Sequence, residues 1–295
     1  MNRVLVADRL ATGVLWAIAL LVVGTLGAII LHFLLAAAGT LNLDFIFGNP
    51  SDVAVGGVGP ILFNSVYILV LTLLITVPLG IMGGIYMAEY AGEGRLTSAI
   101  RFSQELISSV PSIVVGMFGL ALFVTATHWG YTALGGSLAL VVFNLPLMAR
   151  LTEQAIRGVP ADERSGSLAL GTSKWQTIRH VVLPLAIPGI VTGIILTAGR
   201  IFGEAAALIF TSGLSTPAHY DFSNLNLLDA RSPWSPLHPA TTLSVYIWKL
   251  NSEGLGLFVR QIADTSAAVL VLMVLVFNLG ARGLGRLLQR RVTGA

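Results

Sequence analysis

The sequence of 295 residues contains no cysteine and few charged residues, and both deficits restrict what the protein can be. Without cysteine the chain can form no disulfide, no thiolate nucleophile and no cysteine metal site. Charged residues make up 11% of the sequence, whereas soluble domains carry roughly a quarter. Hydrophobic residues reach 55% instead. This composition predicts a membrane protein with several spans rather than a soluble domain.

Six stretches are apolar over a length that fits a membrane span, which takes about 20 residues. They are Leu10–Ala37, Ile61–Ala88, Val110–Thr127, Ser137 to Ala149 or a little beyond, Leu185–Ser212 and Thr265–Ala281. The first is longer than the apolar core of a secretion signal, roughly 7 to 15 residues, so we interpret it as a retained span. We therefore expect an all-α integral membrane protein with six transmembrane helices in a single domain, 1–295.

The segments between these stretches are polar. We expect a loop over Gly39–Pro60, a polar segment over Tyr90–Leu106, a tight turn over His128–Gly136, a charged loop over 150–184 and a long loop over 213–261. The long loop holds His219, Tyr220, Asp221 and His238, but these lack the spacing of metal ligands. We interpret it as a solvated, receptor-facing or connecting loop, and no metal site is predicted.

Basic residues are concentrated in some of these segments. Thirteen of the 17 lysines and arginines lie in the N-terminus, in Tyr90–Leu106, in the loop 150–184 and in the C-terminal tail. Because cytoplasmic loops are enriched in Lys and Arg, we expect both termini and the loop 150–184 on the cytoplasmic side of the cytoplasmic (inner) membrane. The basic residues are dispersed, which suits anionic lipid head groups and does not indicate nucleic acid.

Within the charged loop, local signals predict two short helices, which we call the knob (residues 159–183). The first helix, Ala161–Leu170, follows Pro160 and ends at Gly171, as helices often end at glycine. Ser173 and Gln176 form a capping box that starts the second helix, Lys174–Val182. Pro184 marks the change to the next apolar helix.

Two other interpretations of the knob fail on its context. A DNA-binding helix-turn-helix does not lead directly into a membrane span, as Leu183 does here. The spacing from Gly166 to Ser173 mimics a phosphate-binding loop, but its lysine and the preceding strand are missing. We expect no nucleotide site in this chain.

The fifth span contains two charged residues, Arg200 and Glu204, near its middle. They lie four residues apart, so mutual neutralisation on one helix face is one interpretation. Such a pair contributes only tenths of a kcal/mol, and arginine before glutamate is the weaker order. A charge within the membrane costs a few kcal/mol and normally faces protein or water. Because a guanidinium matches a tetrahedral oxyanion, we predict that Arg200 and Glu204 lie on a substrate path.

Other polar residues within the spans can be explained by structural roles. Ser112 follows Pro111 at the start of the third span, where the proline and hydroxyls either cap a helix or line an anion path. Asn64, Ser65 and Thr72 suit hydrogen bonds between helices.

Several blocks resemble a known family. Gly171, followed after nine residues by Val181, Val182, Leu183 and Pro184, resembles half of the coupling-loop motif of importer-type ABC permeases. The other half departs from it, because Ser165 stands where a glutamate is expected; Glu163 lies two residues earlier. Four blocks are similar to the PstA family of phosphate importer permeases: residues 59–91, 108–119 (SSVPSIVVGMFG), 199–213 (GRIFGEAAALIFTSG) and 238–250.

The resemblance implies a type I ABC importer permease with a cytoplasmic coupling helix pair, and no enzyme activity of its own. Inorganic phosphate would pass Arg200 and Glu204, and Ser112 would line the path. The expected ATPase contacts are Leu168, Ala169, Leu170, Gly171, Thr172, Ser173, Lys174 and Trp175. The implied partners are a PstC-like permease, a PstB-like ATPase dimer that uses ATP and Mg²⁺, and a PstS-like binding protein.

Three alternatives stay open at this stage. The chain could serve another oxyanion such as sulfate or molybdate, or it could be the sister PstC subunit. A secondary anion transporter is the alternative of another class, and it should show an inverted repeat and more paired intramembrane charges.

Overall fold

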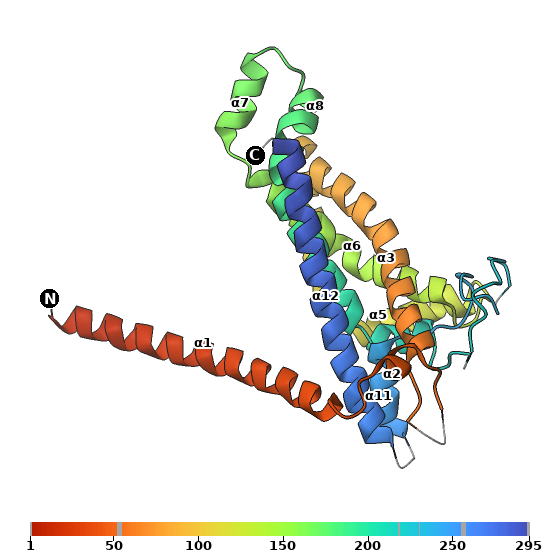
Figure 1. The fold of residues 1–295 in the computed structure, drawn as a ribbon. Coiled ribbons are helices and arrows are strands. Elements are labelled where there is room, and N and C mark those ends of the chain that lie inside the picture. The colour runs from red at the N-terminus through yellow and green to blue at the C-terminus, as the bar shows by residue number, and fades with distance from the viewer. Residues whose placement is uncertain (1, 52–54, 218, 230, 255–257, 294–295) are drawn as a thin grey trace.

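In the computed structural model, every regular element among the described residues is a helix (Figure 1). The structure describes residues 2–51, 55–217, 219–229, 231–254 and 258–293. Small parts of the predicted loops Gly39–Pro60 and 213–261 therefore lie outside the described residues, as do the side chains of Arg290 and Arg291 in the tail.

Twelve α-helices and three π-helical turns are present in the described residues. The α-helices are α1 (Asn2–Ala37), α2 (Leu43–Phe47), α3 (Gly59–Ile85), α4 (Arg95–Ser109), α5 (Ser112–Gly119), α6 (Ala133–Arg157), α7 (Ala161–Ala169), α8 (Lys174–Thr177), α9 (Leu183–Gly203), α10 (Ala206–Thr211), α11 (Leu243–Glu253) and α12 (Val259–Thr293). The π-helical turns are η1 (Tyr86–Tyr90), η2 (Leu120–Thr125) and η3 (Ile178–Val182).

Five helices are long and apolar enough to cross a membrane, and a bent pair adds a sixth candidate. The pair consists of α4 and the α5–η2 segment, which meet at 96°. The predicted third span, Val110–Thr127, is helical over Ser112–Thr125, and Pro111 separates it from α4.

The bundle core forms where α3 packs lengthwise against α6. A side chain at Gly80 would collide with Met148, and one at Gly84 would collide with Thr152. Both contacts have the same sequence offset, so α3 and α6 run parallel. Close approach at glycine is how apolar helices gain contact area in a membrane. α9 packs against α6, and α12 packs against α9.

The knob joins the fifth span without a break. The second knob helix, predicted to end at Val182, instead continues through α8, η3 and α9 as one helix from Lys174 to Gly203. Pro184 does not interrupt it. In the π turn, the Leu183 N–H donates to the Ile178 carbonyl, five residues back, and this wider turn relieves the clash that a proline ring meets in an α-helix.

Several segments expected to be irregular contain helix. The polar segment Tyr90–Leu106 is mostly the amphipathic helix α4, the first loop contains α2, and the long loop contains α11 and the first turn of α12. The predicted turn His128–Gly136 is shorter, because Thr132 caps α6 by accepting a hydrogen bond from the Gly135 N–H. Polarity along the chain does not separate a surface helix from a loop.

Helix α1 extends away from the bundle, and the C-terminal end of α1 meets α12 (Figure 1). Thr40, just after α1, lies 2.5 Å from Thr265 of α12, measured between the hydroxyl oxygens. The knob protrudes at one end of the bundle (Figure 1). The long loop after α10 packs at the other end.

Candidate functional site

Arg200 lies one turn before the end of α9 and is half-buried. Its guanidinium carbon is 3.7 Å from the centre of the Phe143 ring of α6. Stacking on an aromatic face is favourable for a guanidinium and leaves the donors at its edge available. No other described residue forms a hydrogen bond or an ion pair with Arg200. The side chain is therefore supported by the bundle but its charge is not matched by a bonded partner.

The fifth span is broken at Glu204, and the prediction of one helix over Leu185–Ser212 is wrong. α9 ends at Gly203, and Glu204 takes an extended conformation with φ −76° and ψ 119°. Its carboxylate accepts a hydrogen bond from the Ala207 N–H at the start of α10, at 3.3 Å. The Glu204 carbonyl accepts one from the Ser244 hydroxyl, at 2.7 Å. Arg200 and Glu204 therefore do not form the helical pair expected from their spacing.

Helix α5 lies against α10, just beyond this break. A methyl group at Gly116 would lie 2.8 Å from the Ala207 Cα, and one at Gly119 would lie 2.5 Å from the Thr211 side chain. The two helices thus run parallel. Ser112 is the first residue of α5, one turn before Gly116, and is half-buried.

The other hydroxyls of the third predicted block do not line this region. Ser108 donates to the Gln104 carbonyl and Ser109 to the Leu106 carbonyl, both within α4. Such bonds back to the preceding turn are common for serine in helices. The hydroxyls of Ser108 and Ser109 are thus bonded within α4, and the role of Ser112 on an anion path stays a prediction.

The knob has the two predicted helices, and its turn is internally bonded. Gly171 has φ +82°, a conformation that favours glycine. The capping box is present, with the Ser173 N–H donating to Gln176 at 2.8 Å. Three hydroxyls, of Ser167, Thr172 and Thr177, lie within 2.8 to 3.0 Å of one another. This network holds α7 and α8 together as one unit.

The tip of the knob exposes large apolar side chains. All eight predicted contact residues, 168–175, are exposed except Thr172, which is half-buried. Leu170 is 86% exposed and Trp175 is 53% exposed. Ser165, at the position of the motif glutamate, and Glu163 are also exposed. An exposed apolar tip outside the spans is typical of a protein contact.

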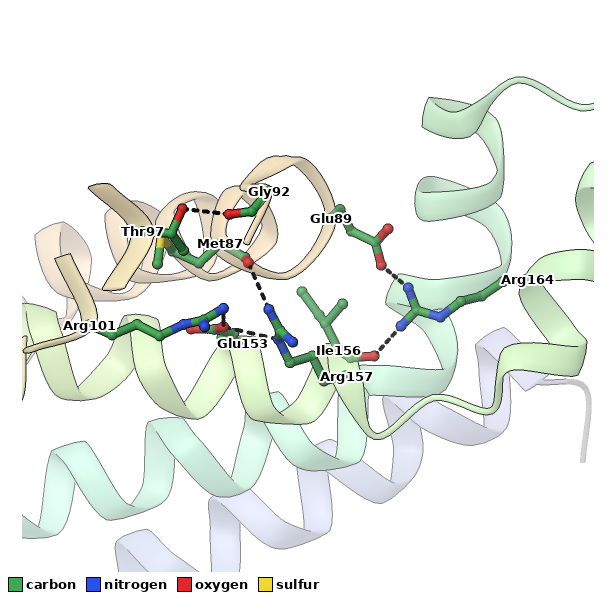
Figure 2. A network of polar contacts seen from close by, with 9 residues as sticks. All are labelled: Met87, Glu89, Gly92, Thr97, Arg101, Glu153, Ile156, Arg157 and Arg164. Carbon is green, nitrogen blue, oxygen red and sulfur yellow. Dashed lines mark hydrogen bonds and ion pairs between the residues drawn. The ribbon is translucent and has the colours of Figure 1, made fainter. Parts of the chain in front are cut away.

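A network that the sequence analysis missed attaches the knob to the bundle (Figure 2). Arg164 of α7 pairs with the Glu89 carboxylate at the end of α3, and it also donates to the Ile156 carbonyl. Lys174 of α8 donates to the Glu89 carbonyl, and its ammonium lies 4.8 Å from the Tyr90 ring centre. Glu89 thus contacts both helices of the knob.

The same figure shows a second carboxylate, Glu153 of α6, held between two arginines. Arg101 of α4 is 2.9 Å away and Arg157 is 3.0 Å away, while the Glu153 side chain is only 8% exposed. Arg157 also donates to the Met87 carbonyl at 3.3 Å. These partners join α4, α6 and the end of α3 beside the knob. Arg157 is four residues from Glu153, but Arg101 is 52 residues from Glu153 and Met87 is 70 residues from Arg157, so no local pattern revealed the network as a whole.

Residues 80–294 match the model of the family described as "Binding-protein-dependent transport system inner membrane component". The chain belongs to this family. It is therefore an ABC importer permease subunit, a multi-pass membrane protein, and its homologues are transporter subunits rather than enzymes.

Relatives of this permease cover most of its length. A protein of Bacillus subtilis named "Probable ABC transporter permease protein YqgI" is 49% identical over 99% of both chains. The "Phosphate transport system permease protein PstA" of Xylella fastidiosa is 34% identical over 80% of this chain and 77% of its own. PstA 1 of Mycobacterium tuberculosis is 33% identical over 77% of this chain and 69% of its own.

Solved structures share the fold of this permease. A chain of a bacterial alginate ABC transporter, in complex with a pentasaccharide-bound periplasmic protein, has a TM-score of 0.62 at 17% identity, covering 97% of this chain and 95% of its own. A chain of the MetNI methionine ABC transporter in an inward-facing form has a TM-score of 0.54 at 18% identity, covering 79% and 94%. The predicted type I importer fold is confirmed.

At the end of the permease opposite the knob, the long loop packs onto α3 and is not simply solvated. Asn64 of α3 accepts a hydrogen bond from the Tyr220 hydroxyl at 2.9 Å, lies 3.2 Å from His238 Nε2, and donates to Thr216. His238 is fully buried. Burial raises the pKa of Tyr220 to about 12 and lowers that of His238. Neither group is set up as a metal ligand.

Of the three residues predicted to bond between helices, Ser65 does so, whereas the bonds of Asn64 go to the long loop. Asn64 is the centre of the cluster just described, and the Ser65 hydroxyl accepts a hydrogen bond from the Leu243 N–H of α11 at 2.8 Å. Thr72 is buried, and its hydroxyl has no partner among the described residues.

Proposed function

We propose that this permease subunit forms half of the pathway of an ATP-driven importer of inorganic phosphate. The observation that carries the proposal is Arg200, a guanidinium inside a span that is stacked on Phe143 and bonded to no carboxylate. A charge held at such a depth without a bonded partner is costly unless a ligand or water reaches it. Its planar fork suits a tetrahedral oxyanion.

The names of relatives support phosphate as this oxyanion. Several relatives at 33% to 34% identity are named phosphate permeases PstA. The relative at 49% identity is named as a permease without a substrate. The chemistry of Arg200 by itself fits other tetrahedral oxyanions, including sulfate and molybdate, so the substrate needs a direct test.

The continuous helix from Lys174 to Gly203 supports a mechanism for coupling. It is 30 residues long, or about 45 Å at 1.5 Å per residue. It carries the knob at one end and Arg200 near the other. An ATPase that moves the knob therefore moves Arg200 with it, between states open to either side. Glu204, beyond the break, limits how tightly the anion is held.

The partners and orientation follow from the same proposal. An ATPase dimer, which uses ATP and Mg²⁺, docks on the residues 168–175 at the exposed tip. A second, PstC-like permease completes the pathway, and a PstS-like binding protein delivers phosphate at the opposite end. The knob and both termini face the cytoplasm, in accord with the basic residues near them. This chain then forms a single permease domain that supplies no catalytic group and no nucleotide site.

Uptake by the reconstituted complex tests the proposal. We expect Arg200→Gln to reduce radiolabelled phosphate uptake by roughly tenfold to a hundredfold, because a hydrogen bond to a charged group is worth about 1.5 to 3 kcal/mol. Arg200→Lys should keep part of the activity. Arg95→Gln removes an exposed charge at the start of α4 and serves as the control.

Three results would contradict this function. Uptake unaffected by Arg200→Gln would remove Arg200 from the pathway. If unlabelled sulfate or molybdate competed with radiolabelled phosphate more strongly than unlabelled phosphate does, the substrate would be that other oxyanion. Uptake that continues without the ATPase subunits would indicate a secondary transporter.

A further inference from the structure

Arg200 belongs to a stripe of side chains on one face of α9. Pro188, Thr192, Leu196 and Arg200 follow one another at intervals of four residues, each about 40° further round the helix, so that Thr192, Leu196 and Arg200 fall within one sector of about 80°. The first three are exposed, and Leu196 is 54% exposed. The face that carries Arg200 therefore continues as an open surface toward the knob.

A groove of about 360 Å³ lies along this stripe, between α9 and α12. The two helices meet closely beside it, because a side chain at Gly285 would lie 2.7 Å from Val191. Arg282 and Arg286 of α12 line the groove opposite Thr192 and Leu196. Both arginines are exposed, and neither forms an ion pair with a described residue. No acidic residue lines the groove.

The groove is distinct from the position of Arg200. The near end of the groove, at Leu196, is about 6 Å along the helix from Arg200, and its far end, at Pro188, is about 18 Å away. A phosphate bound at Arg200 therefore does not fill the far part of the groove. The groove also lies on the knob side of Arg200, because α9 runs from the knob toward the break at Glu204.

Two sources could supply an anion to this groove, a lipid head group and a free oxyanion. The stripe favours the free oxyanion. Arg200 shares one helix face with Thr192 and Leu196, and a charge at that depth must face protein or water. Water that reaches Arg200 along this face also reaches the groove, and a free oxyanion can follow the same route.

We propose that the groove is a second anion site, in which Arg282 and Arg286 hold the phosphate after it leaves Arg200 and before it enters the cytoplasm. This inference rests on the proposed function and extends it from one residue to a sequence of two sites. Two weaker sites in series allow release, whereas one strong site would retain the anion.

Cysteine labelling of the full reconstituted complex tests this site. The absence of cysteine from this chain means that Thr192→Cys introduces one thiol, provided that the partner subunits are freed of reactive cysteines. We expect the anionic reagent MTSES, applied from the knob side, to react with this thiol. Inorganic phosphate should slow the reaction.

Removal of the arginines should abolish this preference. When Arg282→Gln and Arg286→Gln are added to the Thr192→Cys variant, we expect its reaction with MTSES to slow roughly tenfold, because the local positive potential concentrates anions. Its reaction with the cationic reagent MTSET should not slow. Arg95→Gln is the charge control. Leu196→Cys repeats the measurement should Thr192→Cys fail to assemble.

Three outcomes would overturn the inference. The first is that the thiols at both positions remain unreactive. The second is that phosphate gives no protection. The third is that protection depends on the phosphatidylglycerol content of phosphatidylcholine vesicles and not on phosphate, which would indicate a lipid site. Phosphate uptake by the wild-type complex is measured in parallel. Uptake without protection refutes only the second site, whereas absence of uptake refutes the proposed function.

Discussion

Glycines in α3 show how single residues set the distance between two spans. Gly80, Gly83 and Gly84 lie close together in α3, but of the three only Gly80 and Gly84 face a crowded site on α6. A side chain at Gly84 would lie 2.4 Å from Thr152 Cβ and 2.8 Å from the Ala149 carbonyl oxygen. At Gly83 the nearest atom is Ala149 Cβ, at an ordinary 3.6 Å.

We therefore predict different effects of the same substitution at neighbouring positions. Gly84→Ala should destabilise the permease by about 1 to 3 kcal/mol, as overpacking does, because the backbone of α6 has to move. Gly83→Ala should have little effect and is the matched control. Thermal unfolding in detergent measures both, and equal melting temperatures would contradict the close contact.

At the scale of elements, Glu89 is the link between α3 and the knob. Its carboxylate pairs with Arg164, and the two side chains are 10% and 24% exposed. Its carbonyl accepts a hydrogen bond from Lys174. The knob also contacts α6, where Arg164 donates to the Ile156 carbonyl. Motion of the knob can thus reach α3 through Glu89 as well as α9 through the continuous helix.

Loss of this link should uncouple ATP hydrolysis from transport. We expect Glu89→Gln to lower substrate uptake per ATP roughly fivefold, which corresponds to about 1 kcal/mol. Arg164→Gln should act similarly, and the double variant should be no worse than either, because both remove one interaction. Glu93→Gln, an exposed acid nearby, is the control. Additive effects would show that the two residues act separately.

At the scale of the whole molecule, the parallel arrangement of α3 and α6 decides how often the chain crosses the membrane. α3 ends beside the knob, at Glu89. α6 begins at the opposite end, where the Ala133 N–H donates to the His238 carbonyl. The segment between them must therefore cross once, and α5 with η2 provides a short crossing after the amphipathic α4. The chain therefore crosses the membrane six times rather than five.

Labelling from each side tests this topology. We expect Glu93→Cys to react with an impermeant thiol reagent from the knob side, and Trp129→Cys to react from the opposite side. Both positions are exposed. Leu74→Cys, on the lipid-facing surface of α3 and 69% exposed, should react from neither side. Reaction of Glu93→Cys and Trp129→Cys from the same side would contradict a sixth crossing.

Features that depend on neighbouring residues were determined by the sequence itself. The apolar stretches, the knob helices bounded by Pro160, Gly171 and the capping box at Ser173, and the position of Arg200 in a span are all local. Their physical causes, which are hydrophobic length, capping and the cost of a charge in a membrane, act within a few turns.

Tertiary structure decided the features that require residues far apart in the chain. The break at Glu204 is stabilised by Ser244, 40 residues away, and the knob is attached by the pair of Glu89 with Arg164, 75 residues apart. Asn64 gathers the long loop from more than 150 residues away. Hydrogen bonds and ion pairs form wherever the packed helices bring their partners together, so neither propensity nor periodicity along the sequence could have placed them.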